Sequence, residues 1–211
     1  QRTYYAKASG NYGSMINETD IPEGATPLDP DEAAGLKPGL TTRGELNAFE
    51  QANIAQAVAW ARKSRKLKNN LLSIDSLRLL HKRMFDDTWK WAGTFRTTGK
   101  NIGVEPYLIQ TQLSALCGDG NYWLENKTFP MDICAIRFHH RLVSIHPFPN
   151  GNGRHSRLVA DLLMLFAGEP HFTWGGESIE LDGNTRTNYL SALRKADKGN
   201  YEPLIQFAKR S

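Results

Sequence analysis

The sequence has little of several features that would assign it to a common class of protein. Only two cysteines occur in 211 residues, Cys117 and Cys134, and each lies among apolar residues without a metal-ligand spacing. Neither a disulfide framework nor a zinc site is therefore indicated. No apolar run approaches the roughly 20 residues that span a bilayer, and no charged-then-apolar signal opens the chain. We expect a protein of the reducing cytoplasm that does not contact membranes.

The net charge is also small. Lys and Arg number 26 and Asp and Glu 22, which gives a formal charge of +4, too little to indicate direct nucleic-acid binding. One dense basic run, residues 62–68, follows an amphipathic stretch. We interpret this run as the solvated C-terminal end of a helix, where the helix dipole favours cations, and a polyanion site is the alternative.

The composition and the periodicity of the chain are those of a helical globular protein. Hydrophobic residues make up 40% and aromatic residues 10%, which predicts one packed domain. Apolar residues recur at spacings of three and four, and no Gly-x-Gly-x-x-Gly follows a strand. The predicted fold class is all-α. Helices are predicted after Ser73 and over about residues 44–65, 107–124, 130–144, 153–167, 183–197 and 200–209.

Three parts of the chain differ in composition. Residues 1–14 are polar, aromatic and glycine-rich, as in a tag or linker that precedes Met15. Residues 15–41 contain four prolines and predict an extended arm on the surface. Residues 42–211 form the predicted domain, which begins with a helix at a Thr-x-x-Glu capping box. Within it, residues 95–104 place β-branched side chains around Gly-Lys-Asn and predict a small β-hairpin.

The loop after helix 130–144 contains the residues best suited to chemistry. It reads His-Pro-Phe-Pro-Asn-Gly-Asn-Gly over residues 146–153, and its prolines exclude helix. The two glycines that flank Asn152 allow successive backbone N–H groups to point the same way, directly before the positive end of a helix dipole. The loop therefore predicts an anion-binding cradle.

Two arginines and one histidine adjoin this cradle. Arg154 and Arg157 lie three residues apart, so both guanidinium groups can project from one face of the following helix. Two such groups beside a cradle suit a polyphosphate better than a single carboxylate. His146 titrates near neutrality and is the candidate general base toward an attacking hydroxyl.

Together these residues resemble the Fic domain, whose motif is His-x-Phe-x-(Asp/Glu)-Gly-Asn-Gly-Arg-x-x-Arg. The segments Trp89-x-Trp-Ala-Gly and 138–146 are also similar to Fic proteins, and the chain is especially similar to the subgroup called mobile mystery protein B. The resemblance implies a helical bundle around a central helix–loop–helix and an enzyme that transfers AMP from ATP to a Tyr, Ser or Thr hydroxyl of a target protein. The matching positions are His146, Phe148, Gly151, Asn152, Gly153, Arg154 and Arg157.

The resemblance also implies a role for each motif residue. His146 would be the catalytic base, and Phe148 would anchor the loop in the core. Asn150 stands where the family usually has an acidic Mg²⁺ ligand, and a neutral amide is a weaker ligand for this ion. The residues expected to hold the phosphates of ATP are Asn152 and the backbone of Gly151 and Gly153, then Arg154 at the β-phosphate and Arg157 at the γ-phosphate.

Two further expectations follow from the family. A hairpin flap would pair with an extended segment of the target, unless it is an incidental surface hairpin. An inhibitory helix, here residues 42–66, would place a glutamate on Arg157; we favour Glu50 over the capping-box residue Glu45, and a purely structural helix is the alternative. The flap residues are Thr97, Thr98, Gly99, Lys100, Asn101 and Ile102.

The leading hypothesis is therefore a Fic-type protein adenylyltransferase that uses ATP and Mg²⁺. It would be restrained by its own helix or act as a toxin, with a small antitoxin as a further candidate partner. One alternative is a Fic module that binds nucleotide and is catalytically weak or inactive. Another is transfer of UMP or phosphate; the phosphate-transferring Doc relatives carry Lys where this chain has Gly153.

Overall fold

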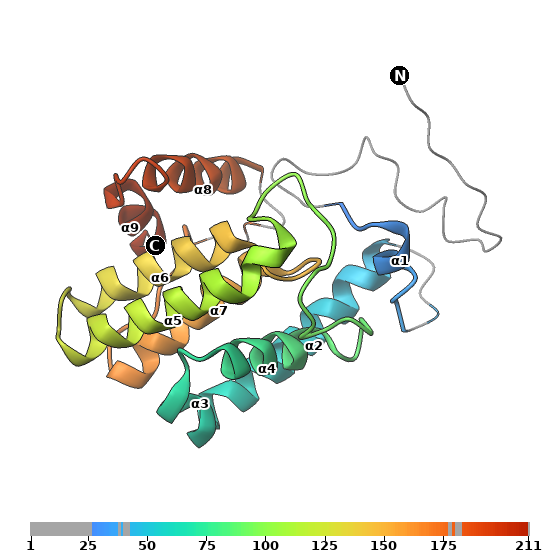
Figure 1. Ribbon diagram of the computed structural model, residues 1–211, viewed down its shortest axis with the longest axis horizontal. Helices are drawn as coiled ribbons and strands as arrows, with labels where there is room; N and C mark the ends of the chain where they lie inside the picture. The colour runs from blue at the N-terminus through green and yellow to red at the C-terminus, as the bar shows by residue number, and fades with distance from the viewer. Residues whose placement is uncertain (1–26, 38, 40–42, 177–178, 180–182, 211) are drawn as a thin grey trace.

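A computed structural model describes residues 27–37, 39, 43–176, 179 and 183–210, and these residues are almost entirely helical (Figure 1). The predicted tag, residues 1–14, and the first residue of the predicted capping box, Thr42, lie outside the described residues. The helices are α1 (Pro30–Ala33), α2 (Arg43–Lys63), α3 (Arg65–Asn70), α4 (Ile74–Phe85), the 3-10 helix η2 (Pro106–Leu108), α5 (Ile109–Glu125), α6 (Met131–Ile145), α7 (Asn152–Ala167), α8 (Gly183–Ala196) and α9 (Glu202–Lys209).

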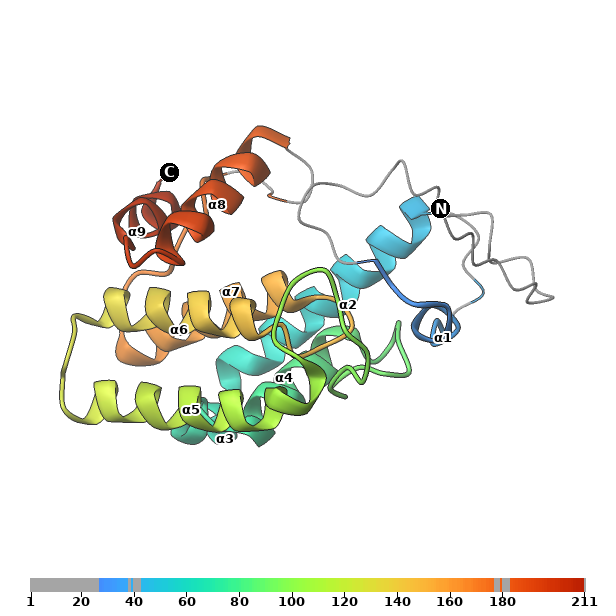
Figure 2. The same cartoon turned by 45° about the horizontal axis from the view of Figure 1, so that its top comes forward.

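The centre of the fold is the antiparallel pair α6 and α7, which the motif loop joins. Helix α5 packs against α6, α2 and α4 pack against each other and against α7, and α9 packs against α6. Figures 1 and 2 show α8 and α9 on one side of the central pair and α2 and α4 on the other. One hydrophobic cluster, with members from α2 to α9, joins these layers. The predicted all-α bundle around a helix–loop–helix is confirmed.

A serine cap explains why a helix boundary falls within the basic run, residues 62–68: α2 ends at Lys63 and α3 begins at Arg65. Ser64 has extended backbone angles, and its hydroxyl accepts a hydrogen bond from the Leu67 N–H at 3.3 Å. Ser73 caps α4 in the same way through the Ser76 N–H at 3.2 Å. A side-chain oxygen at this position satisfies an N–H group that has no partner within its own helix. Residues 62–68 therefore span the end of α2 and most of α3, rather than a single helix end.

The predicted hairpin at residues 95–104 does not form; these residues are an irregular loop. Arg96, which is 3% exposed, holds this loop together in place of cross-strand hydrogen bonds. Its guanidinium donates to the carbonyl oxygen of Thr98 at 2.9 Å and to that of Val104, so it joins the two ends of the loop. A buried guanidinium has five N–H groups to satisfy, and nearby carbonyls supply the acceptors.

The described part of the predicted extended arm contains one short helical turn, α1, which the sequence did not predict. The Asp29 N–H donates to the Glu32 carboxylate at 2.8 Å, a contact that closes the turn. An isolated antiparallel bridge pairs Leu36 with Trp89. Among the described helices, none has the length and apolar character needed to cross a membrane.

Candidate active site

The motif loop is shaped by two residues with left-handed backbone angles. His146 ends α6 at φ 53° and ψ 59°, and Gly151 precedes α7 at φ 76°. A Cβ at Gly151 would lie 2.5 Å from Cζ of Phe85, so both the backbone angles and the space at this position require glycine. The loop between these two residues leads from the base at the end of α6 into the first turn of α7.

Asn152 holds the loop closed through its side-chain amide. Its Oδ1 accepts the Phe148 N–H at 2.9 Å, and its Nδ2 donates to the Phe148 carbonyl at 2.8 Å. Phe148 itself is 0% exposed and stacks on His81 with ring centroids 3.7 Å apart, as expected of an anchor. The side-chain role that the family resemblance implied for Asn152, at the phosphates, differs from this arrangement: both ends of its amide are engaged by the loop.

Replacing Asn152 by alanine is expected to destabilise the fold by roughly 1–3 kcal/mol for each buried group left unpaired, because the Phe148 N–H and carbonyl both lose their partner. Urea unfolding of wild type and variant measures the difference. Asn126→Ala on the exposed end of α5 removes an amide of the same kind and is the control. Equal stability of the Asn152 and Asn126 variants would contradict the clamp.

His81 is a positioning residue that sequence reasoning missed. Its Nδ1 accepts the Gly93 N–H at 3.0 Å, so its proton is on Nε2, which donates to the Asn150 carbonyl at 3.0 Å. Burial holds the pKa of His81 well below its usual range, in agreement with this neutral tautomer. The available signal was a polar residue on the apolar face of α4, four residues after Leu77 and three before Met84.

His146 is 6% exposed and is held in the tautomer that a general base requires. Its Nδ1 lies 3.3 Å from the Val143 carbonyl oxygen, which can only accept, so the proton is on Nδ1 and Nε2 is the basic atom. Burial, with a smaller effect of the cations Arg96 and Lys100, lowers the pKa of His146 to about 4. The imidazole is therefore neutral at physiological pH and can accept a proton.

Arg96 connects the irregular loop to the turn at His146. Its Nε donates to the His146 carbonyl oxygen at 2.6 Å, and the Arg96 N–H donates to the Pro147 carbonyl oxygen at 2.9 Å. The Val104 N–H donates to Ile145 at 3.3 Å. The loop and the base are thus one hydrogen-bonded unit, although fifty residues separate Arg96 from His146 in the chain.

Glu50 binds an arginine of the motif, but not the one expected. Its Oε2 lies 2.8 Å from Nη1 of Arg154, and its Oε1 accepts the Trp89 indole N–H at 2.6 Å. Both carboxylate oxygens are therefore occupied, and the pairing expected with Arg157 is replaced by one with Arg154. The reason is the position of Glu50, which is a buried residue of α2. It faces the Trp89 indole and the first turn of α7, where Arg154 lies. Glu45, the alternative, is exposed.

Arg157 and Gly153 complete the described cradle. The Arg157 guanidinium lies over the Tyr189 ring, 5.5 Å from its centroid. A Cβ at Gly153 would meet only Nη1 of Arg157, at 3.6 Å, so the packing of the protein does not require glycine there. The absence of a side chain leaves the backbone of the first turn accessible to an anion.

The residues present do not make a dedicated magnesium site. Asn150 Oδ1 accepts the Gly151 N–H at 2.6 Å, so this neutral oxygen is already hydrogen-bonded. Among the residues described, no group of three or more His, Cys, Asp or Glu side chains is arranged to hold a metal ion. Mg²⁺ prefers anionic oxygen ligands in octahedral geometry, which one hydrogen-bonded amide does not supply.

The site is thus a buried base at the end of one helix, beside an arginine-rich helix start, in an all-helical fold. Residues 71–164 match the sequence model of the Fic/DOC family. The protein adenylyltransferase fic-1 of Caenorhabditis elegans is 30% identical over 148 residues, which cover 66% of this chain and 27% of that relative. Residues 71–164 therefore form a domain of the Fic/DOC family. The chain spans about a quarter of the length of this curated relative.

Solved structures share the fold. A structure titled Fic-1 (aa134 - 508 E274G) from C. elegans is 26% identical, with a TM-score of 0.59 over 84% of this chain and 51% of that chain. The BepC effector protein of Bartonella tribocorum, solved with bound AMPPNP, has a TM-score of 0.66 and 20% identity over 91% of this chain and 95% of that chain. The all-α architecture of this chain is thus the Fic fold.

Proposed function

We propose that the chain is a protein adenylyltransferase, with the Fic domain beginning near residue 42. The observation that carries the proposal is His146, a neutral imidazole with its proton on Nδ1, which opens the loop into α7, a helix whose first turns carry two arginines. The relatives named protein adenylyltransferases, at 26–30% identity, support it. ATP is the co-substrate, and the second substrate is a hydroxyl of a target protein.

The cradle binds the phosphates of ATP through backbone and arginine groups. The Gly153 N–H and the dipole of α7 face the α- and β-phosphates, Arg154 takes the β-phosphate and Arg157 the γ-phosphate. The Gly151 N–H joins them when a phosphate oxygen replaces Asn150 Oδ1 as its acceptor. Asn152 contributes indirectly, because its amide holds the loop in shape. Phosphoryl chemistry depends mainly on positioning and on stabilising charge, which this arrangement provides.

The step at His146 is a proton transfer coupled to attack. The hydroxyl oxygen of a Tyr, Ser or Thr forms a bond to the α-phosphorus of ATP while the hydroxyl proton passes to Nε2 of His146. The bond from the α-phosphorus to the bridging oxygen breaks, and pyrophosphate leaves. His146 then releases its proton to solvent; its Nδ1–H remains bonded to the Val143 carbonyl throughout.

Magnesium enters this account with the nucleotide. Asn150 supplies at most one neutral oxygen, so we infer that the ion arrives as part of Mg·ATP, held by phosphate oxygens and water. Neutralising phosphate charge is the chemistry it supplies. Transfer of UMP from UTP is a second outcome that the experiments below include.

We further propose that Glu50 inhibits the site by pairing with Arg154. Such a protein would be autoinhibited or toxin-like, and a small antitoxin or a conformational change would control the inhibition. Glu50→Gln should raise ATP affinity about tenfold, because it removes a charged partner of Arg154 while its amide oxygen still accepts the Trp89 N–H. Calorimetry with ATP measures the change. Glu45→Gln, the same charge change on the exposed side of α2, is the control, and equal affinities in Glu50→Gln and wild type would contradict the restraint.

Labelled ATP, UTP and CTP test the activity itself. Wild type and Glu50→Gln, incubated with a cell extract as the source of hydroxyl acceptors, should label protein most strongly from ATP. If the cradle binds nucleotide but the protein is inactive, calorimetry would show tight binding that does not depend on Mg²⁺, and no nucleotide would label protein. That outcome would favour the inactive module over the transferase.

A further inference from the structure

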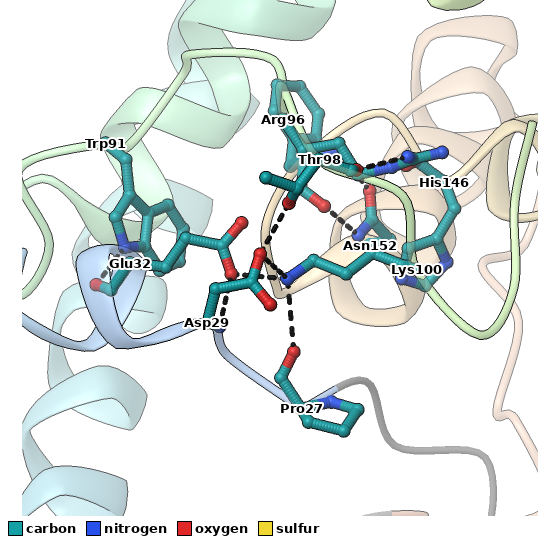
Figure 3. Close-up of polar contacts among 10 residues, drawn as sticks. Pro27, Asp29, Glu32, Trp91, Arg96, Thr98, Lys100, His146 and Asn152 are labelled. Atoms are coloured by element: carbon teal, nitrogen blue, oxygen red, sulfur yellow. Dashed lines mark hydrogen bonds and ion pairs between the residues drawn. The ribbon is translucent and has the colours of Figure 1, made fainter. Parts of the chain in front are cut away.

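The N-terminal arm, defined here as residues 27–37, lies on the irregular loop beside the active site (Figure 3). Lys100 Nζ is 2.5 Å from the Glu32 carboxylate and 3.0 Å from that of Asp29, and it donates to the Pro27 carbonyl at 3.3 Å. The Thr98 hydroxyl donates to Asp29 at 2.5 Å. Two side chains of the loop that was expected to dock the target are therefore engaged by the arm.

Lys100 is unusually buried for a residue in an exposed loop. Its side chain is 3% exposed, while Thr97, Gly99 and Asn101 on the same loop are exposed. An ammonium group removed from water needs a carboxylate partner, since leaving it unpaired is costly. Burial alone would raise the pKa of Asp29, but the hydrogen bonds from Thr98 and Lys100 lower it below its usual value, so Asp29 is ionised. The surroundings of Lys100 therefore favour an acidic partner.

The two ends of the arm are held by different forces. At its C-terminal end, the Lys37 N–H donates to Thr88 at 2.9 Å and the Lys90 N–H donates to Gly35 at 2.8 Å. At its N-terminal end, α1 has no buried residue, and Asp29 and Glu32 contact the loop through their carboxylates. Leu28 packs on the hydrophobic core, and the Trp91 indole N–H donates to the Glu32 carbonyl oxygen at 2.9 Å. Polar contacts of this kind exchange readily for equivalent contacts with another molecule. The carboxylates of Asp29 and Glu32 can therefore give up Lys100 and Thr98 to another acidic group while the backbone pairing near Gly35 persists.

The loop that carries Lys100 is connected to His146 by a hydrogen bond and by close packing. Arg96 joins the loop to the His146 carbonyl oxygen, and a Cβ at Gly103 would lie 2.7 Å from the Cβ of His146. A segment bound at Lys100 is thus set at a fixed place beside the candidate base. This is the position from which a target must present its hydroxyl.

We propose that Lys100 and Thr98 form a docking site for an acidic segment of the target protein, with two carboxylates spaced as in Asp29-x-x-Glu32, and that the arm occupies this site until a target displaces it. The proposal rests on the proposed function and names the chemistry of its protein substrate. Recognition by an ion pair selects acidic segments, in place of the strand pairing expected for a hairpin.

Amide hydrogen exchange of the loop tests the docking site without any transfer reaction. The full chain carrying Asp29→Asn and Glu32→Gln keeps the size of both side chains and removes both charges. Exchange at the amides of Arg96 and Val104, which donate to Pro147 and Ile145 at the two ends of the loop, should rise several-fold in this double variant. Asp31→Asn, on the exposed side of the same turn, should leave it unchanged.

A synthetic peptide of residues 27–37 then serves as the acidic probe. Added to the double variant, it should restore slow exchange, whereas the same peptide with Asn and Gln at the two acidic positions should not. Lys100→Gln, introduced into the double variant, should abolish the protection by the acidic peptide while the melting temperature shows that the chain is folded. Unchanged exchange in the double variant, or no protection by the acidic peptide, would overturn the proposal.

The outcome is separate from that of the transferase assay. If the peptide protects the loop but no nucleotide labels protein, the docking site stands and the proposed activity falls. If nucleotide labels protein but the peptide does not protect the loop, the arm is a fixed part of the fold and the target docks elsewhere.

Discussion

Replacing His146 by alanine is expected to lower the rate of AMP transfer by a factor of roughly 10²–10⁴, the usual contribution of a positioned general base. The reason is geometric: the Val143 carbonyl fixes the proton on Nδ1, and no other described residue of the motif loop has a titratable side chain. ATP affinity should change little, because the phosphates contact the cradle and the arginines. The rate of label transfer and calorimetric binding of ATP measure the two effects.

The matched control is His171→Ala, which removes an exposed histidine outside the site. Its transfer rate should equal that of wild type. A His146→Ala protein that is folded and transfers AMP at the rate of wild type would exclude His146 as the base. Loss of ATP binding together with loss of transfer would instead indicate that the histidine shapes the cradle.

Acid is expected to destabilise the chain progressively below about pH 6.5, because its buried histidines cannot accept protons in the folded state. Burial lowers the pKa of His139 and His155 to about 3 and that of His146 to about 4, and holds the pKa of His81 well below its usual range. In the unfolded chain a histidine binds its proton below about pH 6.5. Stability is therefore complete above pH 6.5 and is lost as the pH falls below it.

One carboxyl opposes this trend. Burial raises the pKa of Asp161 to about 6, so the folded chain holds a proton there that the unfolded chain releases. Four histidines less one carboxyl leave about three protons taken up on unfolding, or about 4 kcal/mol lost per pH unit near pH 5. Typical stabilities of about 5–15 kcal/mol would be exhausted within a few pH units.

Urea unfolding at a series of pH values measures this dependence. His155→Asn keeps a donor for the Leu77 carbonyl and should reduce the slope by about one proton. A free energy of unfolding that does not change between neutral pH and about pH 5 would contradict the burial of these histidines in the neutral state.

The sequence predicted the helices and the motif loop well, because both depend on local rules. Apolar spacing placed α6 and α7, and the Pro and Gly residues placed the loop between them. Phe148 was expected to be buried, and it is 0% exposed. The anion cradle was read from residues that are adjacent in the chain, so no long-range contact was needed.

Long-range contacts are what the sequence could not supply. Arg96 replaces a hairpin by binding carbonyls up to fifty residues away, and His81 supports the motif loop from α4. Glu50 was chosen correctly as a partner of a motif arginine, but which arginine it meets depends on how α2 packs against α7. Lys100 was placed on the docking loop, and its acidic partners on the arm could not be inferred from spacing alone.

The position of the label on ATP tests the central claim most directly. With a cell extract as acceptor, Glu50→Gln should transfer label to protein from ATP marked at the α-phosphate or the adenine and not from ATP marked at the γ-phosphate. His146→Ala should transfer neither. Label from the γ-phosphate, or no label from any position, would contradict AMP transfer by this site.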